Sequence, residues 1–175
     1  LGLKRNELKA RKSEQHVPLP VRRLLVLGDI TQAATRAMLQ TLDSLPEEIL
    51  CKMKIVVKPH PNNPIQKSDY PDLQFKLIDV PLNDIFDETD IVYGSSPTSA
   101  NLDAFLIGLP VIIHQTAGQL NFSPLRGQTG VRFISSAEEL ESALKIVTKR
   151  NDAQSQNYFW LDRELPRWRK LLGRN

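Results

Sequence analysis

Two short segments of this sequence contain the residue types that bind phosphate groups. Lys58-Pro59-His60-Pro61 directly follows an apolar run, 54–57, and Gly94-Ser95-Ser96-Pro97-Thr98 follows a second one, 90–93. In an open parallel α/β sheet, the loops that follow the strands form the ligand crevice. A histidine in one loop and hydroxyl groups at a helix start in another predict a ligand that carries phosphate, so a nucleotide is the first ligand to consider.

The sequence around His60 predicts a rigid loop. Lys58 and His60 each precede a proline, which disfavours helical backbone and favours extended geometry at both positions. A histidine held in this way can donate a hydrogen bond to a phosphate oxygen and, when protonated, offset its charge. The alternative is a turn histidine that binds a backbone carbonyl. Lys58, two residues before His60, is a further candidate for contact with the ligand.

The hydroxyl-rich segment predicts a helix start that binds anions. Ser96 is the candidate N-cap, Pro97 fits the first helical position and Gly108 fits the position just past the helix. Free N–H groups and the positive end of the helix dipole, together with the hydroxyls of Ser95, Ser96 and Thr98, would form a compact phosphate site. Capping alone would require only Ser96.

Further candidates follow other strand ends. Asp103 lies one to two turns into the same helix, where its carboxylate would accept hydrogen bonds from ribose hydroxyls or would simply be solvated. Asn121 and Ser123 belong to a polar loop after the fifth expected strand and are candidate contacts to the sugar or phosphate. Gly28 and Asp29 complete the crevice after the first strand, with Asp29 more readily interpreted as a turn residue than as an acid near the ligand.

The sequence lacks the motifs of several other common binding and catalytic sites. No P-loop, G-x-G-x-x-G turn or G-x-S-x-G nucleophile elbow is present. One cysteine, Cys51, which we expect to be a packed small residue, and three scattered histidines do not form a zinc site, so we expect neither a metal nor a cofactor. Basic residues gather in 1–23 and 159–174 without a nucleic-acid motif. We therefore expect no nucleic acid partner, and the basic ends are either solvated or in contact with anionic lipid.

The pattern of apolar runs and turn residues predicts an α/β fold. Of the 175 residues, 41% are hydrophobic and 25% are charged, as in ordinary globular proteins. The expected strands are 23–27, 53–57, 73–78, 90–93, 109–113 and 131–134, and helical segments are expected at 31–42, 46–50, 81–87, 96–107, 136–150 and 158–172. Strands that alternate with helices and are apolar throughout indicate a doubly wound parallel sheet covered on both faces.

With its motifs in this order, the chain resembles the C-terminal, donor-binding half of a GT-B glycosyltransferase. It is most similar to bacterial surface and capsular polysaccharide enzymes with a His-Pro and a Ser-Ser motif, such as polysialyltransferases and teichoic acid glycerophosphotransferases. The resemblance covers about residues 23–150 and includes S-P-T-S-A-N-L-D-A-F-L-I-G-L-P-V at 96–111.

The resemblance implies a Rossmann-like domain with a role for each motif. His60, Ser95, Ser96 and Thr98 would hold the phosphate of the activated donor. His60 would be the catalytic group, because it would stabilise the departing phosphate. Asp103 would meet the ribose, although glutamate is commoner at that place in the family.

The resemblance also implies the reaction and the organisation of the chain. A sugar would pass from a CMP-, CDP- or UDP-linked donor to a polysaccharide or lipid-linked glycan acceptor. Since GT-B enzymes have two such domains, we expect this chain to be a C-terminal half that is inactive alone. Residues 1–20 would be the interdomain linker, 21–150 the nucleotide-sugar-binding domain and 151–175 a helix that crosses back to the missing N-terminal domain. The expected location is cytoplasmic, with peripheral contact at the inner face of the membrane.

Two alternatives stay open. Nucleotide-sugar 2-epimerases share the GT-B fold and similar phosphate-binding turns. A receiver-like or nucleotide-sensing module would be non-catalytic, with Asp29 and Asp79 as its acids, but the acidic pair expected after the first strand of a receiver is missing.

Overall fold

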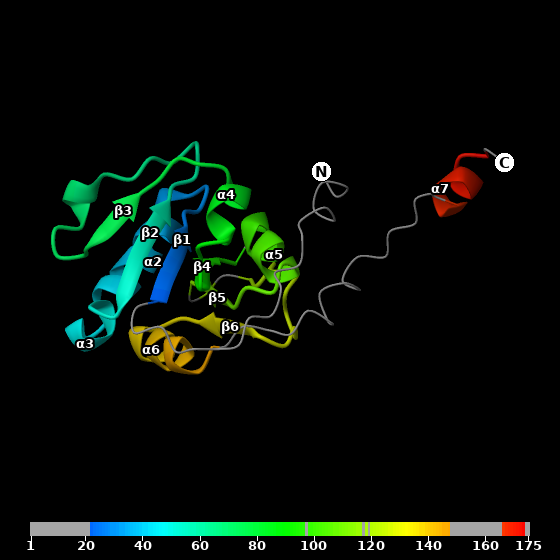
Figure 1. Cartoon of the computed structure of the whole chain (residues 1–175). Helices are drawn as coiled ribbons and strands as arrows, with labels where there is room; N and C mark the ends of the chain where they lie inside the picture. Colours follow the sequence, from blue (N-terminus) through cyan, green and yellow to red (C-terminus); the bar gives the residue numbers. More distant parts are fainter. Residues whose placement is uncertain (1–21, 97, 117, 119, 148–165, 174–175) are drawn as a thin grey trace.

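Six parallel strands form the centre of the molecule, in the order β3-β2-β1-β4-β5-β6 (Figure 1). The computed structural model describes residues 22–96, 98–116, 118, 120–147 and 166–173. The strands are β1 Arg22–Leu27, β2 Met53–Lys58, β3 Phe75–Leu77, β4 Ile91–Ser95, β5 Val111–His114 and β6 Val131–Ile134. All five pairings are parallel, which confirms the doubly wound fold. A receiver has the strand order 2-1-3-4-5, so the sheet argues against the receiver-like alternative.

Helices cover both faces of this sheet. They are α2 Gln32–Asp43, α3 Glu47–Leu50, α4 Leu82–Phe86, α5 Ser99–Leu106, α6 Ala137–Ile146 and α7 Pro166–Leu171, with a short 3₁₀ helix, η1, at Lys67–Asp69. Side chains of α2 and α6 pack with Leu24 and Val26 on one face of β1, whereas those of α4 and α5 pack with Leu25 and Leu27 on the other. Because consecutive strand residues point to opposite faces, a strand buried on both faces must be apolar throughout.

Most of the expected helix boundaries are confirmed. Thr31 caps α2 by accepting a hydrogen bond from the N–H of Ala34, and Ser136 caps α6 by accepting one from Glu139. Gly108 adopts a φ of 84° just beyond α5, a conformation that glycine tolerates without strain.

The start of α5 corrects the sequence-based expectation. The N-cap is Thr98 and the helix begins at Ser99, so the prediction that Ser96 caps this helix is wrong. Ser96 instead donates a hydrogen bond from its hydroxyl to Asn121 Oδ1, which is 3.0 Å away. The helix thus starts two residues later than the local pattern suggests, and the Ser96 side chain makes a long-range contact. Pro97 lies outside the described residues.

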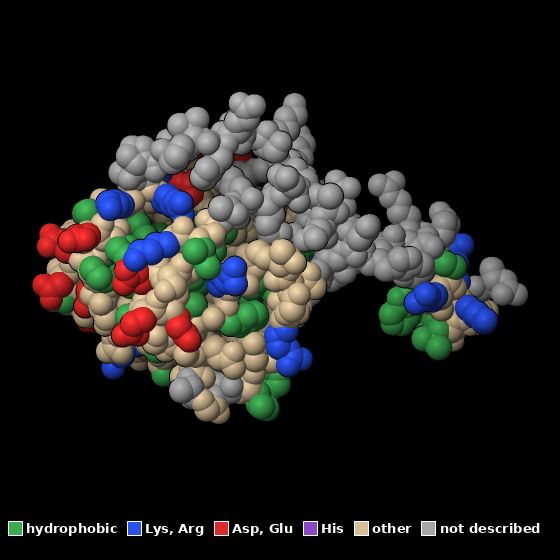
Figure 2. All heavy atoms as spheres, turned by 90° about the horizontal axis from the view of Figure 1, so that it is seen from below, with side chains coloured by type: hydrophobic (Ala, Val, Ile, Leu, Met, Phe, Trp, Pro, Cys, Tyr) green, Lys and Arg blue, Asp and Glu red, His purple; other side chains and the backbone are tan. Residues whose placement is uncertain are grey.

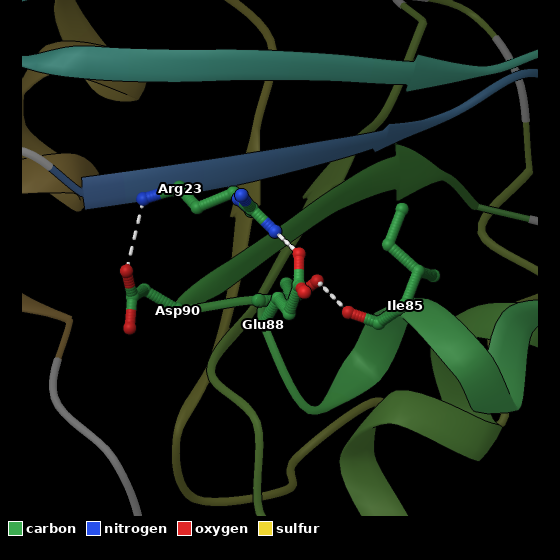
Figure 3. Close-up of polar contacts among 5 residues, drawn as sticks. Arg23, Ile85, Glu88 and Asp90 are labelled. Carbon is green, nitrogen blue, oxygen red and sulfur yellow. Dashed lines mark hydrogen bonds and ion pairs between the residues drawn. The ribbon is translucent and has the colours of Figure 1, made fainter. Parts of the chain in front are cut away.

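Charged groups hold together the amino-terminal edge of the sheet (Figure 3). The backbone N–H of Arg23 donates to Asp90 Oδ2 at 2.9 Å, and the Arg23 guanidinium forms an ion pair with Glu88. The hydroxyl of Thr89 donates to the carbonyl of Ile85 at 2.9 Å. These contacts anchor β1 to the start of β4, at the edge opposite the carboxyl ends of the strands.

Outside the sheet, the structure tests few of the expectations. The proposed linker, residues 1–20, and most of the proposed crossing helix, including Trp160, lie outside the described residues, so those domain boundaries stay predictions. In α7, Trp168 is exposed, together with Leu171 and the following Leu172. Lys and Arg side chains stand beside these hydrophobic ones (Figure 2). Cys51 is exposed, so the expectation that it is packed is wrong.

Candidate functional site

A cleft of about 330 Å³ lies at the carboxyl ends of β1 and β2 and the start of α5. Its walls are residues 27–30 after β1, residues 58–61 at and after the end of β2, residues 98–100 at the start of α5, and Leu82 of α4. The strand order reverses between β1 and β4, and this switch point is where open α/β sheets bind ligands. All four residues of the first predicted segment, 58–61, and Thr98 of the second therefore line the same cleft.

The loop that carries His60 is held close to β1. The N–H of Gly28 donates to the carbonyl of Lys58 at 2.9 Å. A Cβ at position 28 would lie 2.9 Å from the backbone nitrogen of His60, so only glycine allows this approach. The carbonyl of His60 accepts from the N–H of Asn63 at 2.8 Å. The loop is therefore fixed by its backbone as well as by its prolines.

The ring of His60 has a defined hydrogen-bonding direction. Its Nδ1 accepts a hydrogen bond from the N–H of Asn62 at 3.2 Å. In a neutral imidazole, one ring nitrogen accepts and the other donates, so this contact places the proton on Nε2. This contact is to a backbone N–H and not to the carbonyl that the structural alternative required. His60 is half-buried and lines the cleft, and Nε2–H is its remaining ring donor.

Asp29 is the buried charge of the cleft, with only 3% of its surface exposed. Its Oδ1 accepts from the N–H and the hydroxyl of Thr31, at 2.7 and 2.8 Å. Its Oδ2 accepts from the hydroxyl of Ser95. The carbonyl of Asp29 accepts from Nδ2 of Asn63 at 3.1 Å. Asp29 is thus the turn residue that the sequence suggested, and it also joins the loops after β1, β2 and β4.

The hydroxyl-rich segment divides into two groups. Ser95 and Ser96 are buried and do not belong to the cleft wall, whereas Thr98 and Ser99 line it. Thr98 Oγ1 lies 2.7 Å from Ser95 Oγ. Ser96 is bonded to Asn121, whose Oδ1 also accepts from the N–H of Ser123 at 2.9 Å. Asn121, predicted as a ligand contact, therefore connects the loop after β5 to the end of β4.

The other predicted residues take varied positions. Gly28 and Lys58 line the cleft, with Lys58 Nζ 3.8 Å from a carboxylate oxygen of the exposed Asp79. Asp103 is half-buried in α5 and does not belong to the cleft wall. Ser123 is buried, and its hydroxyl accepts from the N–H of Leu125 at 3.2 Å, which is a turn-forming role.

Two residues of the site were missed by sequence reasoning. Ser99 lines the cleft, and its signal was its place in the hydroxyl run. Asn101 is 1% exposed, and its Nδ2 donates to the carbonyl of Ser95 at 2.7 Å, which fixes the end of β4. Asn101 has this place because Gly94 lacks a side chain: a Cβ there would lie 2.2 Å from Asn101 Oδ1.

His114 has a structural environment. Its Nε2 lies 3.2 Å from Thr41 Oγ1, and its ring packs edge-on against Tyr93. Burial lowers the pKa of His114, because the charged ring would lose its hydration, and burial raises the pKa of Tyr93. Among the described residues, no group of three or more His, Cys, Asp or Glu side chains is placed to hold a metal ion.

Comparison with solved structures shows what the fold resembles. The glycotransferase of kitacinnamycin matches with a TM-score of 0.55 and 12% identity over 85% of this chain and 41% of its own. KpsC of Thermosulfurimonas dismutans, a beta Kdo 2,7 transferase, matches with a TM-score of 0.50 and 20% sequence identity, over 77% of this chain and 45% of KpsC. A putative UDP-N-acetylglucosamine 2-epimerase from Listeria monocytogenes matches with a TM-score of 0.52 and 15% sequence identity, over 87% of this chain and 49% of the Listeria protein. No protein-family model and no curated protein matches the sequence.

These similarities show the fold of the chain. It has a Rossmann-like α/β fold of the kind present in glycosyltransferases and in a nucleotide-sugar epimerase. The chain spans less than half the length of each of these proteins. Within the described part of the chain, no helix combines the length and the apolar character needed to cross a bilayer.

Proposed function

We propose that this chain is the donor-binding half of a glycosyltransferase. The observation that carries the proposal is that His60 and the start of α5 line one cleft at the switch point of the sheet. In this site, His60 Nε2–H and the N–H groups at the start of α5 bind the donor phosphate. These groups present donors and the positive end of a helix dipole to an anion. Ser95 and Ser96 hold the segment in place, and a ribose beyond the cleft meets Asp103.

The proposed chemistry is stabilisation of a leaving group. The bond between the sugar and the phosphate oxygen breaks while an acceptor hydroxyl bonds to the sugar. Negative charge builds up on the departing phosphate, and His60 Nε2–H and the start of α5 stabilise it. The proton of the acceptor goes to a base outside this chain. The donor is a CMP-, CDP- or UDP-linked sugar, and the acceptor is a surface polysaccharide or lipid-linked glycan.

Nucleotide binding by the 175-residue chain tests the proposal. Calorimetry with CMP, CDP, UMP and UDP, against their nucleosides, should give weak binding that depends on the phosphate, since a second domain would supply the rest of the cleft. If no nucleotide binds at millimolar concentration, the proposal fails. A nucleoside that binds as well as its nucleotide would also count against a phosphate site.

A second candidate function is a nucleotide-sugar 2-epimerase, which the similarity to the Listeria protein favours. An epimerase and a glycosyltransferase would bind the donor phosphate in the same way. Their products differ, so the test is incubation of the two-domain protein with UDP-N-acetylglucosamine. An epimer formed without acceptor supports the epimerase, whereas transfer that requires an acceptor supports the glycosyltransferase.

We also propose that the chain works beside an N-terminal domain on the cytoplasmic face of a membrane. Support comes from the exposed Trp168, Leu171 and Leu172 beside Arg167, Arg169 and Lys170. Aromatic and basic side chains together favour the surface of anionic lipid. In sedimentation experiments, the chain should bind vesicles that contain phosphatidylserine and pellet with them. Trp168→Ala should reduce the fraction of the chain in the pellet.

A further inference from the structure

A chain of three polar side chains connects the floor of the cleft to its rim. Asp29 Oδ2 accepts from the hydroxyl of Ser95, and Ser95 Oγ lies 2.7 Å from Thr98 Oγ1. Asp29 and Ser95 are each 3% exposed, and Asp29 and Thr98 line the cleft. The direction of the hydrogen bonds in this chain decides what Thr98 offers to a ligand.

That direction follows from counting protons. A serine hydroxyl has one proton and two acceptor positions, and a carboxylate only accepts. Ser95 gives its proton to Asp29, so it has none left for Thr98. The contact between the two hydroxyls therefore requires the Thr98 proton to point inward, to Ser95. Thr98 then presents only acceptor lone pairs to the cleft, beside the negative charge of Asp29.

An acceptor beside a buried carboxylate is unsuited to a phosphate oxygen, which also only accepts. We propose that Asp29 is a positioning residue that turns this hydroxyl chain inward, so that Thr98 accepts a hydrogen bond from a sugar hydroxyl of the bound donor and does not bind its phosphate. The inference rests on the proposed function for the identity of the ligand. It removes Thr98 and Ser95 from the phosphate site and leaves that task to His60 and the start of α5.

Asp29→Asn should reverse the direction of the hydrogen bonds between residue 29, Ser95 and Thr98, with little change in the shape of the side chain at position 29. The Asn oxygen can still accept from the N–H and hydroxyl of Thr31, while its NH₂ group faces Ser95 in place of Oδ2. Ser95 then accepts from residue 29 and gives its proton to Thr98, whose own proton turns into the cleft. The variant thus replaces an acceptor by a donor at Thr98 and removes a negative charge from the cleft.

Binding of inorganic pyrophosphate by the 175-residue chain tests this reversal. Thr98→Val in the parent chain should change pyrophosphate affinity less than about twofold, but should lower UDP-N-acetylglucosamine affinity about fivefold, because it removes the acceptor for a hydroxyl of the transferred sugar. In the Asp29→Asn background, the same Thr98→Val change should lower pyrophosphate affinity about tenfold, because a donor is then lost. Thr41→Val, the same change outside the cleft, is the matched control. An equal loss of pyrophosphate and UDP-N-acetylglucosamine affinity in the parent chain would overturn the proposal.

The direction of the hydrogen bonds between Asp29, Ser95 and Thr98 can also be measured without a ligand. In NMR spectra of the parent chain in water, the Thr98 hydroxyl proton should exchange slowly and give cross-peaks to the Ser95 β protons. In Asp29→Asn, it should exchange at the rate of an exposed threonine. Rapid exchange in the parent chain would overturn the proposal even if Asp29→Asn failed to fold. If neither pyrophosphate nor any nucleotide binds, the proposed function fails. The NMR measurement still decides the direction of the hydrogen bond between Thr98 and Ser95.

Discussion

Replacement of His60 by alanine separates a ligand-binding histidine from a structural one. The ring makes a contact to the N–H of Asn62, whereas the backbone of residue 60 bonds to Asn63 and packs against Gly28. His60→Ala removes the ring and keeps these backbone contacts. The Asn62 N–H is exposed, so water can replace the ring nitrogen. We expect the free energy of unfolding to fall by no more than about 1 kcal/mol.

The expected loss of nucleotide affinity is much larger. In the proposed site, Nε2–H donates to a phosphate oxygen, and a hydrogen bond to a charged group contributes roughly 1.5–3 kcal/mol. Nucleotide affinity should therefore fall roughly 10- to 150-fold. The rate of transfer in the two-domain protein should fall further, because the charge on the departing phosphate is largest in the transition state.

Calorimetry measures the affinity, and urea denaturation of the same samples measures the stability. His60→Asn is the matched variant, because its amide oxygen can accept from Asn62 while its NH₂ group donates. It should recover part of the nucleotide affinity that His60→Ala loses. If His60→Ala lowers stability by several kcal/mol and leaves nucleotide affinity unchanged, the histidine is structural and the reasoning about the phosphate site is refuted.

Three further predictions concern stability. Burial lowers the pKa of His114, so the His114 ring binds a proton at a higher pH in the unfolded chain than in the folded one. The free energy of unfolding should therefore fall as pH drops below about 6.5. Urea denaturation at several pH values should show this dependence, and His114→Gln should remove it. Gly28→Ala should cost about 1–3 kcal/mol and weaken nucleotide binding, because its Cβ would push against the backbone of His60; unchanged denaturation and calorimetry would contradict the close packing. Ser96→Ala should cost about 1 kcal/mol by releasing Asn121, with faster hydrogen exchange in the loop after β5 but not in α5; faster exchange in α5 would restore the capping role.

The sequence by itself determined the sheet and the position of the cleft. Each strand is a short apolar run bounded by turn residues, and this pattern is local, because burial on both faces requires every residue of the run to be apolar. The caps Thr31 and Ser136 and the end of α5 at Gly108 are local as well, since they depend on bonds within one turn. Because parallel strands end at one edge, the loops with His60 and Thr98 had to meet there.

The tertiary structure alone decided which polar groups in those loops are available. Ser95 bonds to Asp29, 66 positions away in the chain, and Ser96 bonds to Asn121, 25 positions away. No local pattern specifies such partners, because they depend on which loops the sheet order brings together. The count of hydroxyls therefore pointed to a phosphate site made by Ser95, Ser96 and Thr98, whereas the fold buries the first two and, in the proposal above, the third gives its proton to Ser95. A hydroxyl has one proton, and only its three-dimensional neighbours determine where that proton goes.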